Sequence, residues 1–290
     1  MINKINKEKI VVKKADSTQA FNFVQNMHKE IWSLDDIEVT PAHIYSAVNN
    51  NGGLTLCAYY LDKPVGYVFG FCGKDEENNI YFYSHNLGVI EEFRNYGIGF
   101  LLKLELAKEL LKQNINIVKW SFDPLDSKNA NLYINKLGAI SDTYINDYYG
   151  DMQDGINKNL PGDRIVAEWS INDSLVEKMS IGHELRKKTN TYNLKKDRML
   201  NSVKTDDKNI TYPIDDNKSI IHEKSKKHYY LEIPTNIDVL KKISFETVLD
   251  WRSHVRDIMK YCFKNNFFIS DTIYTNNKFY FVLTFKKGEK

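Results

Sequence analysis

The stretch Leu87-Gly88-Val89-Ile90-Glu91-Glu92-Phe93-Arg94-Asn95-Tyr96-Gly97-Ile98-Gly99-Phe100-Leu101-Leu102 is the most informative part of this 290-residue chain. It joins residues 81–89, which have the pattern of a strand, to residues 96–113, the longest helical pattern. Gly97 and Gly99 stand where the helix begins. Several backbone N–H groups can converge there with no side chain in the way, at the positive end of the helix dipole. The stretch therefore predicts a site for a pyrophosphate group.

Two other phosphate-binding motifs are excluded. A Walker A loop requires Gly-Lys-Ser/Thr, which does not follow Gly99, and a Rossmann fingerprint requires a third glycine where this sequence has Leu102. The glycine pair alone is equally compatible with an ordinary helix start. The interpretation therefore depends on the elements around it.

The surrounding pattern predicts an α/β fold, a mixed sheet with helices on its faces. A hairpin of two strands precedes the strand at 81–89, and a further strand and a short helix follow the glycine-rich helix. The predicted strands are 10–14, 54–60, 65–72, 81–89, 117–122, 139–149 and 164–170, and the predicted helices are 18–31, a short one after Pro41, 96–113 and 129–136.

Arg94-x-x-Gly97-x-Gly99 resembles the Arg/Gln-x-x-Gly-x-Gly/Ala signature of the GNAT N-acetyltransferase superfamily. The order of predicted elements is also similar, over about residues 8–170. The resemblance implies a GNAT fold in which the fourth and fifth strands splay apart to admit acyl-CoA.

Further motifs resemble a branch of predicted GNAT acyltransferases associated with N-acylation, including N-succinylation, of amino-acid-like amines. They are Ser84-His85-x-Leu87-Gly88-Val89, Trp120-x-Phe122-Asp123-Pro124-Leu125, Asn129-Ala130, Tyr149-Gly150 and Pro161-x-Asp163-Arg164. The resemblance implies acetyl-CoA or succinyl-CoA as co-substrate, with no metal.

The resemblance also assigns contacts with the co-substrate. The backbone N–H groups of Gly97, Ile98, Gly99 and Phe100 would hold the pyrophosphate, with Arg94 and Asn95 leading into the loop. The backbones of Leu87 and Val89 would pair with pantetheine and polarise the thioester carbonyl, and Asn129 and Tyr133 would line the slot.

The residues at the usual positions of the catalytic base and acid depart from the family's pattern. Many relatives have a glutamate base on the fourth strand, but residues 81–86 contain no carboxylate, and His85 alone titrates near neutrality there. His85 is therefore predicted as the base, against a structural histidine as the alternative. Carboxylates acting through water are a further alternative: Asp35, Asp36, Glu38 and Asp123.

The predicted acid is Tyr133, although it does not match the expected position. Relatives place a tyrosine four residues before the glycine that ends the short helix, and that position here is Ile134. Tyr133 is one residue early, which turns it by about 100° on a helix. Tyr144, Tyr148 and Tyr149 are alternatives from the next strand.

Composition excludes several classes of protein. Lys+Arg 40 against Asp+Glu 38 gives a net charge of +2, which argues against a nucleic-acid partner. Cys57, Cys72 and Cys262 are too few and too widely spaced for a disulfide framework or a zinc site. There is no signal-peptide pattern and no apolar run long enough to span a membrane, so a cytoplasmic location with no membrane partner is expected.

The chain is predicted to have three parts: residues 8–170, the acyl-CoA-binding catalytic domain; residues 171–228, a polar linker region; and residues 229–290, a strand–helix–hairpin extension. In the extension's helix, residues 244–263, the polar side chains opposite the apolar face are expected to be solvated. These are Arg252, His254, Arg256 and Asp257.

The function predicted is an acyl-CoA-dependent N-acyltransferase for a small amine acceptor, and the resemblance also suggests a homodimer. The alternative is an acyl-CoA-binding protein of the same fold that acts as a decarboxylase, a hydrolase or a sensor. The missing glutamate and the displaced tyrosine motivate that alternative.

Overall fold

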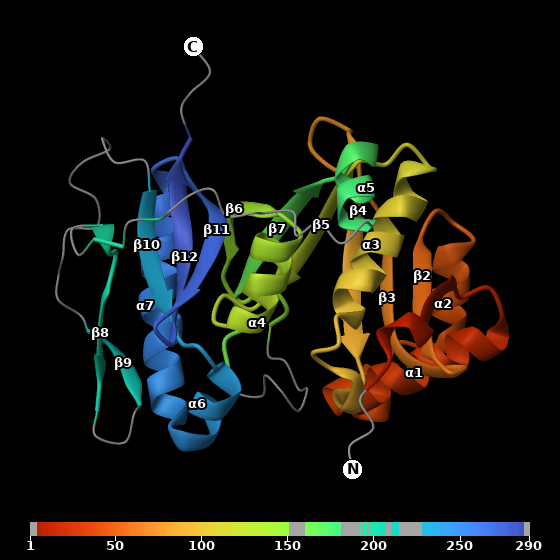
Figure 1. The fold of residues 1–290 in the computed structure, drawn as a ribbon, viewed down its shortest axis with the longest axis horizontal. Coiled ribbons are helices and arrows are strands. Elements are labelled where there is room, and N and C mark those ends of the chain that lie inside the picture. The colour runs from red at the N-terminus through yellow and green to blue at the C-terminus, as the bar shows by residue number, and fades with distance from the viewer. Residues whose placement is uncertain are drawn as a thin grey trace. The chain divides into compact units, whose positions relative to one another are not determined.

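The computed structural model describes residues 5–150, 160–180, 192, 194–195, 198–206, 210–214 and 228–286 (Figure 1). The chain divides into two compact units. The first unit contains Met1–Trp120, Met152–Asn159 and Ser170–Glu184, and the second contains Ser121–Asp151, Leu160–Trp169 and Leu185–Lys290.

The first unit is built on a mixed sheet, as the sequence predicts. Strands β1 (Ile10–Lys14), β2 (Leu54–Tyr60), β3 (Lys63–Lys74) and β4 (Ile80–Val89) are antiparallel neighbours in that order, and β5 (Ile117–Phe122) runs parallel to β4. The last two residues of β5 belong to the second unit. Leu61 and Asp62 form a two-residue turn between β2 and β3 with φ of 48° and 67°, which is the type I′ geometry that suits a hairpin.

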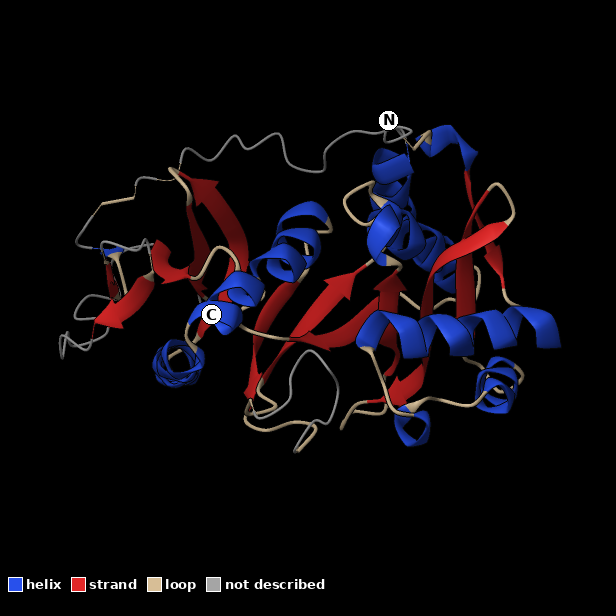
Figure 2. Cartoon of the chain, turned by 90° about the horizontal axis from the view of Figure 1, so that it is seen from below, coloured by secondary structure: helices blue, strands red, loops and turns tan. Residues whose placement is uncertain are grey.

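Helices cover both faces of these strands (Figure 2). On one face, α1 (Thr18–Trp32) and α2 (Ala42–Asn49) contact the side chains of Tyr67 and Phe69. On the other face, α3 (Ile98–Leu111) places Lys103 against Ser84 and Trp120, and α5 (Asp173–Ser180) packs beside α3.

Helix α1 begins where the sequence predicts because Ser17 accepts a hydrogen bond from the Ala20 N–H, which satisfies one of the unpaired donors of the first turn. Short 3₁₀ turns lie at Lys7–Lys9, Asp36–Glu38 and Glu91–Phe93.

The second unit has its own strands, in the order β7, β6, β11, β12, β10. The neighbouring pairs recorded among them, β6–β7, β6–β11, β11–β12 and β10–β12, are antiparallel. Its elements are α4 (Ser127–Ala130), a π-helix (Asn131–Lys136), β6 (Ile140–Ile145), β7 (Arg164–Ser170), β10 (His228–Ile233), α6 (Ile237–Ile243), α7 (Phe245–Lys264), β11 (Phe267–Thr275) and β12 (Lys278–Phe285). A separate pair, β8 (Ser202–Thr205) and β9 (Thr211–Ile214), lies in the region predicted as a polar linker.

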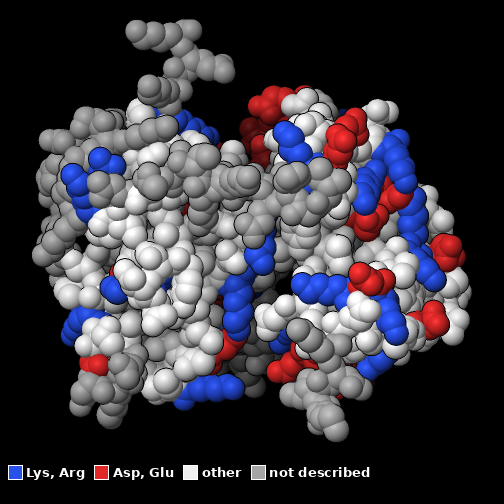
Figure 3. Space-filling model, in the orientation of Figure 1, with Lys and Arg blue, Asp and Glu red and all other residues white. Residues whose placement is uncertain are grey.

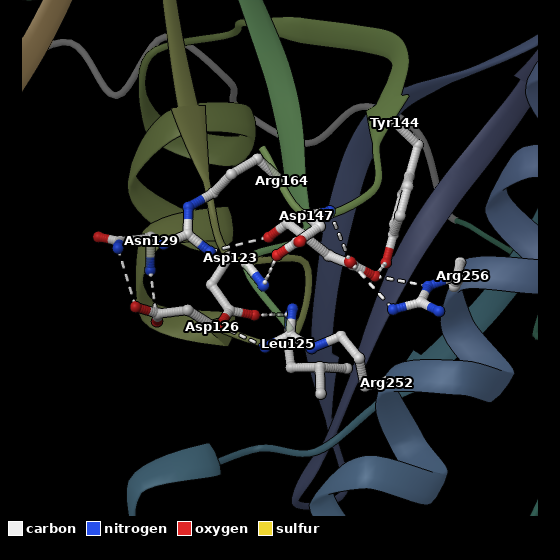
Figure 4. Close-up of polar contacts among 11 residues, drawn as sticks. Asp123, Leu125, Asp126, Asn129, Tyr144, Asp147, Arg164, Arg252 and Arg256 are labelled. Carbon is white, nitrogen blue, oxygen red and sulfur yellow. Dashed lines mark hydrogen bonds and ion pairs between the residues drawn. The ribbon is translucent and has the colours of Figure 1, made fainter. Parts of the chain in front are cut away.

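A network of charged side chains connects α7 to strand β6 and to the segments before and after it (Figure 4). Arg256 donates from Nε and Nη2 to the two carboxylate oxygens of Asp163, at 2.7 and 3.0 Å. The Tyr144 hydroxyl and the Asp147 N–H donate to the same carboxylate, at 2.6 and 3.1 Å. Asp163 is fully buried, so these four hydrogen bonds replace the water that it loses.

A second buried pair joins Arg252 of α7 to Asp123, with Nη2 2.6 Å from Oδ2. The Arg252 side chain is 1% exposed, so the expectation that it lies on a solvated helix face is wrong. Burial alone would raise the pKa of Asp123, but the guanidinium beside it more than offsets this and lowers that pKa. Both aspartates of the network therefore remain charged, each held by an arginine of α7.

On the face shown in Figure 3, basic and acidic side chains are interspersed over the first unit. Within the described residues, no helix combines the length and hydropathy needed to cross a membrane.

Replacing Arg252 with Met should destabilise the second unit strongly. The substitution leaves the Asp123 carboxylate in a largely buried site without its cation, and breaking a buried pair in this way costs about 3–5 kcal/mol. Urea unfolding followed by tryptophan fluorescence should show the loss. The control is Lys128→Met, whose pair with Asp238 has side chains 65% and 55% exposed and should contribute less than about 1 kcal/mol. Equal losses in the two variants would contradict the importance of the buried pair.

Candidate active site

Strand β4 loses its neighbour on one side partway along its length. Its parallel pairing with β5 is recorded at Phe82↔Val118 and Tyr83↔Lys119, while β4 itself continues to Val89. The opposite edge of β4 stays paired with β3 as far as Gly66↔Val89. This is the opening between the fourth and fifth strands that the sequence predicts.

The register shows which backbone groups of β4 face the opening. The Ile90 N–H donates to the Val65 carbonyl on the β3 side, at 3.0 Å. Because backbone groups alternate along a strand, those of Leu87 and Val89 face away from β3. They form the free edge against which an extended ligand can add like a further strand.

A β-bulge lies just before this free edge. Phe69 pairs with Asn86 and the next residue, Gly70, pairs with Ser84, so His85 is an extra residue in β4. The His85 ring is partly exposed and lies against Phe69, Phe71 and Tyr83, with centroid distances of 6.2, 6.0 and 6.2 Å. The loss of water around the ring lowers the pKa of His85, so the imidazole is neutral at pH 7 and can accept a proton.

The glycine-rich turn has the geometry that an anion site requires. Asn95 and Gly97 have φ of 68° and 86°, and Gly97 precedes the first residue of α3, Ile98. An added Cβ at Gly97 would meet no atom within 4 Å, so the backbone conformation is what calls for glycine there. The first helical bond is Leu101 N–H to Gly97 O, and the N–H groups of the first turn before it have no intrahelical acceptor. They are available to a phosphate group.

Arg94 connects the turn to the free edge. Its Nε donates to the Val89 carbonyl at 3.1 Å, and Val89 is one of the residues whose backbone faces the opening. The predicted pyrophosphate and pantetheine residues of the first unit are therefore brought together: Leu87, Val89, Arg94, Asn95, Gly97, Ile98, Gly99 and Phe100.

His28 of α1 is a member of the site that sequence reasoning missed. Its ring is buried, its Nδ1 accepts a hydrogen bond from the Thr40 N–H at 3.3 Å, and its Nε2 lies 3.3 Å from the side-chain amide of Asn86, the residue after the bulge. Burial, and then the nearby His85, lower the pKa of His28 to about 4. A neutral ring that accepts at Nδ1 carries its proton on Nε2, which faces the side-chain amide of Asn86.

The remaining predicted residues lie in the second unit. Asp123 is paired with Arg252, which makes it a weak base. Asn129 donates from its side-chain amide and its backbone N–H to Asp126, at 2.8 and 3.0 Å, and so helps to cap α4. Asp126 is half-buried, and the loss of water around its carboxylate raises its pKa to about 6.

Tyr133 lies in the π-helix Asn131–Lys136, not in the α-helix that the sequence predicts. A π-helix has a wider turn than an α-helix, so the same number of residues covers a different angle around its axis. Counting four residues back from Gly138 therefore does not identify the residue at the position of the family's tyrosine. Tyr133 is 6% exposed, and burial raises the pKa of its hydroxyl, which makes it a poor acid. Among the alternatives, the Tyr144 hydroxyl donates a hydrogen bond to Asp163, and the Tyr149 hydroxyl lies 3.1 Å from that of Ser121.

The described residues contain no group of three or more His, Cys, Asp or Glu side chains placed to hold a metal ion.

The other carboxylates considered as bases lie exposed in and beside the 3₁₀ turn after α1. They are Asp35, Asp36 and Glu38, and Asp36 pairs there with Lys29.

A mixed sheet that opens beside β4, next to a helix that starts at a left-handed glycine, defines a GNAT-type fold. Residues 19–139 match the model of the acetyltransferase (GNAT) family. This segment is therefore a GNAT acetyltransferase domain, which confirms the superfamily and the enzyme class predicted from the sequence.

Solved structures of acetyltransferases resemble the chain. Arabidopsis thaliana Naa50 in complex with a bisubstrate analogue is 21% identical, with a TM-score of 0.45 over 56% of this chain and 99% of that one. A GNAT family acetyltransferase from Elizabethkingia anophelis with acetyl-CoA bound is 15% identical, with a TM-score of 0.45 over 57% and 100%. The ribosomal-protein-S18-alanine N-acetyltransferase of Escherichia coli is 14% identical, with a TM-score of 0.44 over 56% and 94%. No curated protein sequence matches the chain. At these identities, the family assignment rests on the matched segment 19–139.

Replacing His28 with Gln should remove part of the pH dependence of stability. His28 has a pKa of about 4 in the folded chain and an ordinary value of 6.5, so the unfolded chain binds more protons between these values. Wild-type stability should therefore fall from pH 6.5 to pH 4, with about 3 kcal/mol of the loss due to His28. Urea unfolding at pH 7 and pH 4.5 should show a smaller fall in His28→Gln. The exposed His43→Gln is the control, and a fall as steep in His28→Gln as in wild type would refute the assignment.

Proposed function

We propose that this chain transfers an acetyl, succinyl or similar acyl group from acyl-CoA to the amine of a small amino-acid-like acceptor. The observation that carries the proposal is the free edge of β4 at Leu87 and Val89, which lies beside the unpaired N–H groups at the start of α3. The homodimer that the resemblance suggests stays a prediction.

The proposed contacts with acyl-CoA are mostly backbone contacts. The N–H groups of Gly97, Ile98, Gly99 and Phe100 hold the pyrophosphate, and the edge of β4 holds the pantetheine arm. An N–H of that edge polarises the thioester carbonyl and stabilises the negative charge that develops on its oxygen. Arg94, Asn95 and Asn129 are the further contacts proposed.

His85 is the proposed base. The acceptor arrives as an ammonium ion and gives one proton to the neutral His85 ring, which frees the nitrogen lone pair. The nitrogen then bonds to the carbonyl carbon, and it loses a second proton to water as the carbon–sulfur bond breaks and the electron pair leaves on sulfur. The thiolate takes a proton from the His85 imidazolium or from water. Neither Asp123 nor Tyr133 is used in this scheme, because the first is paired with Arg252 and the second is a poor acid.

A thermal-shift titration with CoA should test the pyrophosphate site. A ligand at 100 times its Kd should stabilise the wild type by about 2.7 kcal/mol. Gly97→Ala places a side chain at φ of 86°, which costs about 1–2 kcal/mol unless the turn moves, and should weaken CoA binding about tenfold. Gly138→Ala is a matched control, because Gly138 also has a positive φ, 77°, and open space around its Cα. It should lower stability without changing CoA affinity. No CoA-induced shift in the wild type would refute the proposed function.

Replacing His85 with Gln should lower kcat/KM by about 10²–10⁴, the usual contribution of a positioned base. In the wild type, the acid limb of the pH profile should have its midpoint below 6.5, because the pKa of His85 is lowered, and this limb should be absent in the variant. The exposed His43→Gln is again the control. An unchanged profile in His85→Gln would exclude this base, and release of CoA without any acceptor would favour a hydrolase.

A further inference from the structure

Three aromatic rings form an exposed surface on the first unit, here called the aromatic platform: Phe71 of β3, and Tyr83 and His85 of β4. Phe71 and Tyr83 are paired across the two strands, with ring centroids 5.7 Å apart. The bulge brings the His85 ring to 6.0 Å from Phe71 and 6.2 Å from Tyr83. Phe71 remains 39% exposed and His85 is also exposed, so part of the platform faces solvent.

The platform continues a face that is buried further along the same strands. Tyr67 and Phe69 precede Phe71 on that face of β3 and are both buried, with the His28 ring of α1 against Tyr67 and the Tyr45 ring of α2 against Phe69. The apolar surface therefore extends beyond the part that packs against α1 and α2. Clustered apolar side chains that stay exposed at a protein surface mark interaction sites or ligand-binding grooves.

The position of His85 indicates which ligand. This step rests on the proposed function, in which His85 accepts a proton from the acceptor. The amine nitrogen must then lie about 3 Å from a ring nitrogen of His85. Since the Phe71 and Tyr83 rings have their centroids about 6 Å from the His85 ring, a group attached to the carbon next to the amine lies over them.

We propose that the aromatic platform binds the side chain of the acceptor, and that the acceptor is a primary amine with an apolar, flat side chain. Aromatic faces stack on such groups, and they also attract the ammonium ion before it loses its proton. A polyhydroxylated or strongly anionic acceptor gains neither contact. Such an amine can come from a free amino-acid derivative or from the N-terminal residue of a peptide.

The test compares acceptors that differ only in the side chain. The full chain is assayed with saturating acetyl-CoA, or with succinyl-CoA if that donor gives the larger thermal shift. The acceptors are phenylalanine amide and alanine amide, with peptides that begin in Phe or Ala as a second pair. The wild type should prefer the aromatic member of a pair by about tenfold or more in kcat/KM. The pair that shows the preference identifies the source of the amine.

Phe71→Ala should reduce this preference about tenfold, and Phe71→Leu, which keeps most of the volume, should reduce it less. The CoA-induced thermal shift reports on folding and on the pyrophosphate site, and it should be the same in both variants and wild type. Ile80→Ala is the control, because Ile80 is 56% exposed at the start of β4 but lies on the opposite face from Tyr83. It should keep the wild-type preference.

Two outcomes overturn the inference by itself. The first is a wild type that acylates aromatic and small amines equally well. The second is a preference that survives in both Phe71 variants. In either case CoA binding and the dependence on His85 would still support the proposed function. Failure of CoA to bind the wild type would overturn the proposed function, and this inference with it.

Discussion

The candidate site of the first unit depends on one strand edge, because β4 continues beyond the last of its residues that pairs with β5. Backbone N–H and C=O groups at a strand edge require partners, and an edge without them is a site where another extended chain can bind. Here the recorded pairing with β5 ends at Tyr83 while β4 continues to Val89. The other features of the site are arranged around this edge. The bulge at His85 comes just before it, and Arg94 contacts the Val89 carbonyl on it. Helix α3 starts after it in the chain.

The second unit has a different constraint, which is the burial of two aspartates. Asp123 and Asp163 belong to the part of the chain that the family resemblance covers, but their cations, Arg252 and Arg256, come from α7 near the C-terminus. Strand β11 of the same C-terminal region also pairs with β6, at Ile269↔Ser141. The C-terminal region is therefore part of the folded core of the second unit. A chain cut near residue 172 would leave both carboxylates without their arginines, so such a truncation cannot isolate the role of the C-terminal region in activity.

The sequence predicted well those features that depend on local pattern. The strands of the first unit, α1 and the glycine-started helix appear within a few residues of their predicted bounds, because periodicity is local. It missed the bulge at His85, since a bulge appears only in the register with β3. It missed His28 because this residue has the spacing of a core position in α1, and its contact with Asn86 spans 58 residues of sequence.

The other failures have the same origin. Arg252 and Arg256 looked like the solvated side of an amphipathic helix, since the carboxylates that pair with them are 129 and 93 residues away in sequence. The position of Tyr133 was counted on an α-helix, but the segment forms a π-helix, for which the sequence carried no signal that we could identify. Local rules therefore placed the elements and the glycine-rich turn, while the polar contacts around the candidate site depend on tertiary pairing.

His28 and His85 explain how the proposed base could accept a proton from an ammonium ion although strand β4 carries no carboxylate. The loss of water around each ring disfavours its protonated form and so lowers its pKa. The nearby His85 is a further reason for the low pKa of His28. A second positive charge at His28 would oppose both the approach of the ammonium ion and the transfer of its proton to His85. Burial keeps the His28 ring neutral, and the hydrogen bond from the Thr40 N–H to Nδ1 is compatible with that neutral ring. His28 is therefore held neutral, while His85, on the exposed side of the bulge, is the base that we propose.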